Sequence, residues 1–210
     1  YQYMSLALAL TAIISMGAAS SAQFINLIHG TPLKWVIAFA PLGMAFYMGS
    51  RLMSMSVTGA QTCFMIFATL MGLSLSSIFI MYTGESVAKV FFITAGTFGA
   101  MSIYGHTTKR DLTSMGSFLI MGVVGLLIAS IANIFMKSSA MQFIISIIGV
   151  GIFTLLTAYD SQKIKALYYQ TQSSAEVTQK LAIYGSFTLY MDFINLFVFL
   201  LQLLGVRRND

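Results

Sequence analysis

The stretch GSFTLYMDFINLFVFLLQLLG, residues 185–205, is apolar almost throughout and carries a single carboxylate, Asp192. A helix needs about 20 predominantly apolar residues to cross the roughly 30 Å hydrocarbon core of a bilayer. The stretch therefore predicts a membrane-spanning helix with Asp192 near mid-membrane. An aspartate at the centre of such a helix costs about 2.5–3.5 kcal/mol on insertion scales, so its presence needs a reason.

The composition of the whole chain agrees with a membrane protein. Of its 210 residues, 58% are hydrophobic and 8% are charged, whereas a soluble domain carries about 25% charged residues to cover its surface. The net charge of +5 comes from basic residues in short gaps between apolar runs. This placement favours membrane orientation over nucleic-acid binding, so we expect a lipid bilayer and no nucleic acid as a partner.

Apolar runs separated by short polar breaks predict an all-α integral membrane protein with a single domain, residues 1–210. The predicted spans are at about 3–28, 34–50, 56–82, 87–106, 114–136, 140–166 and 180–205. Only the segment 162–179 is long and polar, and its first half could extend the sixth helix beyond the bilayer.

Orientation follows from the basic residues in alternate loops. The loops on the side of the N-terminus hold Arg51, Lys109, Arg110, Lys163, Lys165 and Lys180. The opposite loops hold the other five of the eleven Lys and Arg, so the bias in number is small. The denser clusters place the N-terminus and the segment 162–179 in the cytoplasm.

Two acids fall inside the predicted spans. Asp160 lies about twenty residues into the sixth helix, and Asp192 lies about 17 Å along the seventh at 1.5 Å per residue. If the two helices are antiparallel neighbours, the acids lie at similar depths. Each acid also shares a helix face with polar residues, which predicts an inward polar stripe. The two faces comprise Thr188, Asp192 and Asn195, and Thr157, Asp160 and Lys163.

Two carboxylates held close together in a low-dielectric site cannot both ionise easily, so they titrate in coupled steps and can sense protons. When ionised, they offer hard oxygen ligands for a divalent cation. Calcium takes six to eight oxygens, so backbone carbonyls, Asn195 or water would have to complete its shell. The pair Asp160 and Asp192 thus suits transient cation passage rather than tight storage.

Structural explanations stand beside this one. Asp160 could form an interfacial ion pair with Lys163 or lie outside the hydrocarbon, and Asp192 could be a hydrogen-bonded acid that locks helix packing. The sequence contains no HExxH, Walker A, GxGxxG or GxSxG motif, so we expect neither an enzyme nor a resident cofactor. Cys63, the single cysteine, excludes an intrachain disulfide.

The C-terminal half resembles the bacterial branch of the Bax inhibitor-1 family, the transmembrane Bax inhibitor motif proteins. The matching stretches are MSIYGHTTKRDLTSMGSFLIMG at 101–122, IANIF at 131–135, AYDSQKIK at 158–165 and SFTLYMDFINLFVFLLQLLG at 186–205. The resemblance implies a seven-helix fold with the last helix central. It also implies a pH-sensitive calcium leak across the bacterial inner membrane, gated by two aspartates that match Asp160 and Asp192.

Members of this family also carry a basic residue near the end of the second helix that pairs with the acids. A gapless match puts Gly49 at that position in the segment AFYMGSR. Arg51 is the nearby basic residue that could act as the latch, with Lys163, Asn195 and Thr188 as supporting groups.

Three functions follow as hypotheses. The first is a passive, pH-modulated calcium leak channel with Asp160 and Asp192 as sensor, inner constriction and transient calcium ligands. The second is a non-channel protein that modulates a membrane protease or another membrane complex, with structural acids. The third is a proton-coupled transporter, which would show saturable uptake of one solute.

Overall fold

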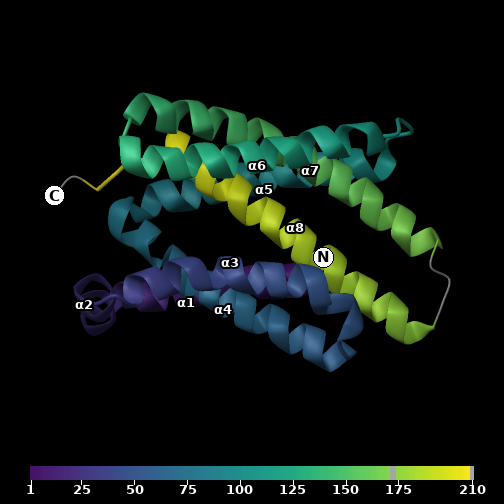
Figure 1. The fold of residues 1–210 in the computed structure, drawn as a ribbon, viewed down its shortest axis with the longest axis horizontal. Helices are drawn as coiled ribbons and strands as arrows, with labels where there is room; N and C mark the ends of the chain where they lie inside the picture. The colour runs from purple at the N-terminus through teal and green to yellow at the C-terminus, as the bar shows by residue number, and fades with distance from the viewer. Residues whose placement is uncertain (171–173, 209–210) are drawn as a thin grey trace. The chain divides into compact units, whose positions relative to one another are not determined.

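The computed structural model describes residues 1–170 and 174–208, leaving out the side chains of residues 27–30. Its described residues form helices and no strand; one isolated bridge joins Tyr82 and Arg207. The helices are α1 (Gln2–Ser20), α2 (Ala22–Gly30), α3 (Leu33–Arg51), the short 3-10 helix η1 (Leu52–Ser54), α4 (Val57–Met81), α5 (Gly84–Thr107), α6 (Thr113–Met136), α7 (Ser139–Gln170) and α8 (Ala175–Leu204) (Figure 1).

Within the described residues, seven helical segments are long and apolar enough to span a bilayer, namely α1, α3 with η1, and α4 to α8. The predicted all-α, seven-span class is therefore confirmed. The chain divides into two compact units. The first contains α1 to α4 and the N-terminal half of α8. The second contains α5 from Glu85 onward, all of α6 and α7, and the C-terminal half of α8.

Two predicted boundaries are wrong. The expected first span, 3–28, is interrupted at Ser21, whose extended backbone ends α1 and whose side chain accepts a hydrogen bond from the Phe24 N–H at the start of α2. A serine at an N-cap competes with helix continuation in this way. In the polar segment 162–179, α7 continues to Gln170, as predicted for its first half, whereas α8 begins at Ala175 and not at the predicted residue 180.

In the first unit, α1 and α3 both pack against α4 (Figure 1). Thr11 of α1 donates to the Ala68 carbonyl of α4 at 3.0 Å, and its hydroxyl lies 2.7 Å from the hydroxyl of Tyr190 in α8. Phe64 and Phe67 of α4 meet the Tyr190 ring edge to face. Short polar contacts and close ring packing hold membrane helices together where lipid provides no hydrophobic driving force.

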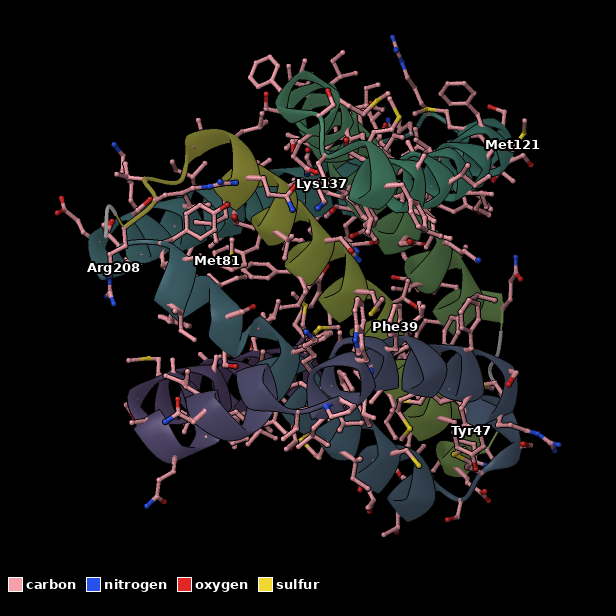
Figure 2. All side chains as sticks on the ribbon, turned by 60° about the vertical axis from the view of Figure 1, so that its left-hand side comes forward. Phe39, Tyr47, Met81, Met121, Lys137 and Arg208 are labelled. Atoms are coloured by element: carbon pink, nitrogen blue, oxygen red, sulfur yellow. The ribbon has the colours of Figure 1, made fainter. Side chains whose placement is uncertain are left out.

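The end of this unit is tied to the segment that follows α8. The Arg208 N–H donates to the Met81 carbonyl at 2.9 Å, and Figure 2 shows the two residues next to each other. This contact satisfies a carbonyl in the last turn of α4 that has no partner within its own helix.

In the second unit, α6 and α7 lie side by side (Figure 1). Glycines allow the close approaches: a Cβ on Gly116 of α6 would overlap the Tyr159 ring of α7, and one on Gly149 of α7 would overlap the Phe199 ring of α8. Such small residues are enriched where membrane helices meet because they let backbones approach. In the most apolar stretch of α8, 56% of the residues are buried, against at most 33% for any other span in the described part of the chain.

Candidate functional site

Asp160 is held in place by the contact of α7 with α5. A Cβ on Gly105 of α5 would overlap the backbone carbonyl of Ala158, so the two helices touch through their backbones. One turn away, the hydroxyls of Ser102 and Ser161 lie 2.9 Å apart, within hydrogen-bond distance. Asp160 lies between these two contacts along α7 and is 8% exposed.

Asp192 is positioned by aromatic packing of α8 on α5. The ring of its neighbour Phe193 meets the rings of Phe91 and Phe98 edge to face, each with centroids 5.5 Å apart. Asp192 itself is 4% exposed, and its Oδ2 is the one buried side-chain oxygen or nitrogen without a hydrogen-bond partner among the described residues. A buried polar atom without a partner is costly, so it marks a site that a proton, water or cation could complete.

The two acids meet within the second unit. The carboxyl groups of Asp160 and Asp192 are close enough to influence each other's ionisation, by charge and through their side-chain oxygens. A hydrogen bond between two carboxyl groups requires a proton on one of them, because a carboxylate only accepts. The contact therefore changes with protonation: a proton shared between the two groups joins α7 to α8, and loss of the last proton leaves two anions that repel.

The polar residues on the same faces have other partners. Thr157, Thr188 and Asn195 donate to carbonyls of their own helices, those of Phe153, Tyr184 and Met191. Their hydroxyl and amide groups therefore donate hydrogen bonds to backbone carbonyls of their own helices and not to the two acids.

The two basic residues singled out by sequence differ in their surroundings. Lys163 attracts the Asp160 carboxylate without forming an ion pair; its Nζ lies 5.7 Å from the centre of the Tyr159 ring. Arg51 is exposed at the end of α3, in the first unit.

The groups on α5 that position the acids were missed by sequence analysis. Ser102 and Gly105 fall in the stretch AMSIYGH, where three-residue spacing puts two small residues on one helix face. Small residues spaced in this way often mark a helix–helix interface, and this signal could have identified α5 as the neighbour of Asp160.

No group of three or more His, Cys, Asp or Glu side chains within the described residues could hold a metal ion. A cation at the pair would therefore find two carboxyl groups and no third acid. The remaining oxygens would have to come from backbone carbonyls, amide groups or water.

Comparison with known proteins identifies the family. The family model described as "Inhibitor of apoptosis-promoting Bax1" matches residues 1–209. The chain belongs to the Bax inhibitor-1 family. The match includes the N-terminal half as well as the C-terminal stretches that carry the resemblance.

Bacterial members of the Bax inhibitor-1 family are similar over nearly their whole length. A protein of Rickettsia prowazekii is 48% identical over 100% of this chain and 88% of its own. A protein of Borreliella burgdorferi is 42% identical over 99% of this chain and 90% of its own. The inner membrane protein YbhL of Escherichia coli K12 is 41% identical over the same shares.

Proposed function

We propose that this Bax inhibitor-1 family member is a passive, pH-sensitive calcium leak channel of the bacterial inner membrane, with its N-terminus in the cytoplasm and no enzymatic activity. The observation that supports this proposal most strongly is the buried contact between the carboxyl groups of Asp160 and Asp192. Ionisable groups inside a membrane are expensive, and they are found along ion pathways and proton relays.

Protonation acts in this proposal through the contact between α7 and α8. With one proton, the two carboxyl groups share a hydrogen bond, and such bonds contribute about 0.5–1.5 kcal/mol. Without it, two unit charges about 4 Å apart repel by about 4 kcal/mol at an effective dielectric constant of about 20. Because the repulsion is larger than the bond it replaces, the doubly ionised pair must separate, take up a cation or draw in water.

Calcium is the proposed cargo because the ionised pair supplies hard oxygen ligands. Asn195 lies one turn along α8 from Asp192 and could offer its amide oxygen, while backbone carbonyls and water would supply the rest. A shell with only two carboxylates and much water binds calcium weakly, which suits an ion that has to leave the site again. Arg51 remains the proposed latch, and Lys163 is a cation that already attracts Asp160.

The decisive experiment measures calcium flux into liposomes containing the purified chain across a range of pH. The variants are Asp160→Asn, Asp192→Asn and the double variant, which retain the shape and hydrogen-bonding capacity of the acids but remove their charge. Asp111→Asn is the matched control because Asp111 is an exposed acid in the loop between α5 and α6.

The proposal expects pH-dependent flux in the wild type and in Asp111→Asn, and a flux that no longer follows pH in the double variant. Wild-type, pH-dependent flux in the double variant would refute the role of the two acids. Absence of flux at every pH, together with a membrane protease that co-purifies, would replace the channel with the modulator hypothesis. Saturable uptake of one solute driven by a proton gradient would replace it with the transporter.

A further inference from the structure

A groove lies between α6 and the last turns of α7, apart from the pair of acids. Its volume is about 240 Å³, and its lining includes Thr113 of α6 and Tyr159, Lys163, Leu167 and Gln170 of α7. The lining combines a cation, an amide and a hydroxyl with an aromatic ring and aliphatic side chains. Such a mixed surface suits an amphipathic ligand.

Gly116 and Gln162 fix the positions of the helix and loop segments that line the groove. Gly116 leaves room for the Tyr159 ring, above which the Lys163 ammonium lies 5.7 Å from the ring centre. Gln162 joins the loop before α6 to α7, because its Oε1 accepts from the Leu112 N–H at 2.9 Å and its Nε2 donates to the Arg110 carbonyl at 2.8 Å. The loop is therefore held against the same helix that carries Lys163.

The charge around the groove is mainly positive. Lys163 is exposed in its wall, and the loop that Gln162 holds carries the exposed side chains of Lys109 and Arg110. None of these three forms an ion pair with a carboxylate in the described part of the chain. The acid in this loop, Asp111, accepts a hydrogen bond from the Thr113 N–H at 2.8 Å. Three cations without ion pairs next to one cavity favour an anionic occupant.

The length of α7 places the end of the groove that is lined by Leu167 and Gln170 at the level of the lipid headgroups. Its 32 residues extend about 48 Å at 1.5 Å per residue, well beyond a hydrocarbon core of about 30 Å. The groove is lined by the polar end of this helix. On the outer surface of α6, Phe118 is 71% exposed and Met121 is 72% exposed, and Figure 2 shows Met121 at the outside of the helix. An occupant with a polar head in the groove therefore has an apolar helix face beside it for its chains.

We propose that this groove binds the headgroup of an anionic phospholipid, with the Lys163 ammonium and the Gln170 amide contacting the phosphate and Lys109 and Arg110 attracting the negative charge. Basic pockets between membrane helices bind lipid headgroups in this way. The Tyr159 ring and Leu167 line the apolar part of the groove. This inference does not depend on the calcium leak: the two share Lys163, but lipid binding is measured without any ion flux.

The test is native mass spectrometry of the purified full chain with phosphatidylglycerol or phosphatidylcholine added in equal amounts. Lys163→Gln removes the charge in the groove, and Lys163→Arg restores it. Lys89→Gln is the matched control, since Lys89 is also an exposed lysine and lies near the N-terminal end of α5, away from the groove. Thermal unfolding of each variant in the same detergent monitors folding.

The groove should bind phosphatidylglycerol in preference to phosphatidylcholine, and Lys163→Gln should weaken that binding about fivefold, the effect of one basic residue on an anionic lipid. Lys163→Arg and Lys89→Gln should bind as the wild type does. Equal binding of the two lipids would overturn the proposal, as would an equal loss in Lys163→Gln and Lys89→Gln. Full displacement of the lipid by inorganic phosphate would also overturn it, because the site would then recognise a free anion.

Discussion

Replacing Gly105 by alanine should push α5 away from α7 next to Asp160. A Cβ built on Gly105 overlaps the carbonyl oxygen of Ala158 and lies 2.7 Å from its carbonyl carbon and 2.8 Å from its Cα. Real Cβ atoms essentially never approach other heavy atoms to less than 3.0 Å, so a backbone must move. No side-chain rotation can relieve the overlap, because the opposing atoms belong to the backbone of α7.

The change in stability caused by Gly105→Ala is the sum of two opposing effects. Overpacking a close interface costs about 1–3 kcal/mol. Alanine also gains up to about 1 kcal/mol over glycine in helix propensity. Gly99→Ala on the same helix isolates the second effect, since nothing lies within 4 Å of a Cβ there. Gly105→Ala should therefore be about 1–3 kcal/mol less stable than Gly99→Ala, or about 2–12 °C lower in Tm for a chain of this size.

The assay is thermal unfolding of both variants and the wild type in one detergent, followed by circular dichroism. Gly99→Ala should melt at or slightly above the wild type and Gly105→Ala clearly below Gly99→Ala. Equal melting temperatures for the two variants would refute the close backbone contact of α5 with α7. That result would also remove the structural basis for the position of Asp160.

Two further predictions concern single hydrogen bonds. Tyr190→Phe removes the 2.7 Å contact with the Thr11 hydroxyl and should destabilise the chain by about 0.5–1.5 kcal/mol. Thr11→Val should destabilise it more, because it also removes the hydrogen bond to the Ala68 carbonyl. Equal stability of Tyr190→Phe and the wild type in chemical denaturation would contradict this. The hydrogen bonds of Asp111 with the Thr113 side chain and backbone hold its pKa below the ordinary 3.8, so its stabilisation is present above that pH and is lost as the pH falls through the lower value. Asp111→Ala should thus melt below the wild type at neutral pH, and the difference should shrink below about pH 3; a difference that does not vary with pH would contradict this origin.

Sequence periodicity predicted the spans well because the hydrocarbon core imposes a minimum apolar length on each one. It failed at Ser21, where a local hydrogen bond to the Phe24 N–H interrupts an apolar run without lowering its hydropathy. It also placed the start of the last helix too late, at residue 180 and not at Ala175, because polarity excludes a segment from the hydrocarbon and does not prevent it from being helical. Hydropathy measures a preference for lipid, and hydrogen bonds decide where a helix begins and ends.

The sequence by itself determined that this chain lies in a membrane, that it spans it seven times, and that Asp160 and Asp192 lie in the last two spans. These properties depend on composition and on spacing along single helices. Only the tertiary structure decided that the two carboxyl groups meet, since this depends on the rotation and separation of α7 and α8. The rotation and separation of α7 and α8 are set by their contacts with α5: the backbone contact at Gly105, the Ser102–Ser161 contact and the packing of Phe193. A rotation of one residue about a helix axis, roughly 100°, would turn either acid away from the other, and periodicity along one helix carries no information about its neighbour.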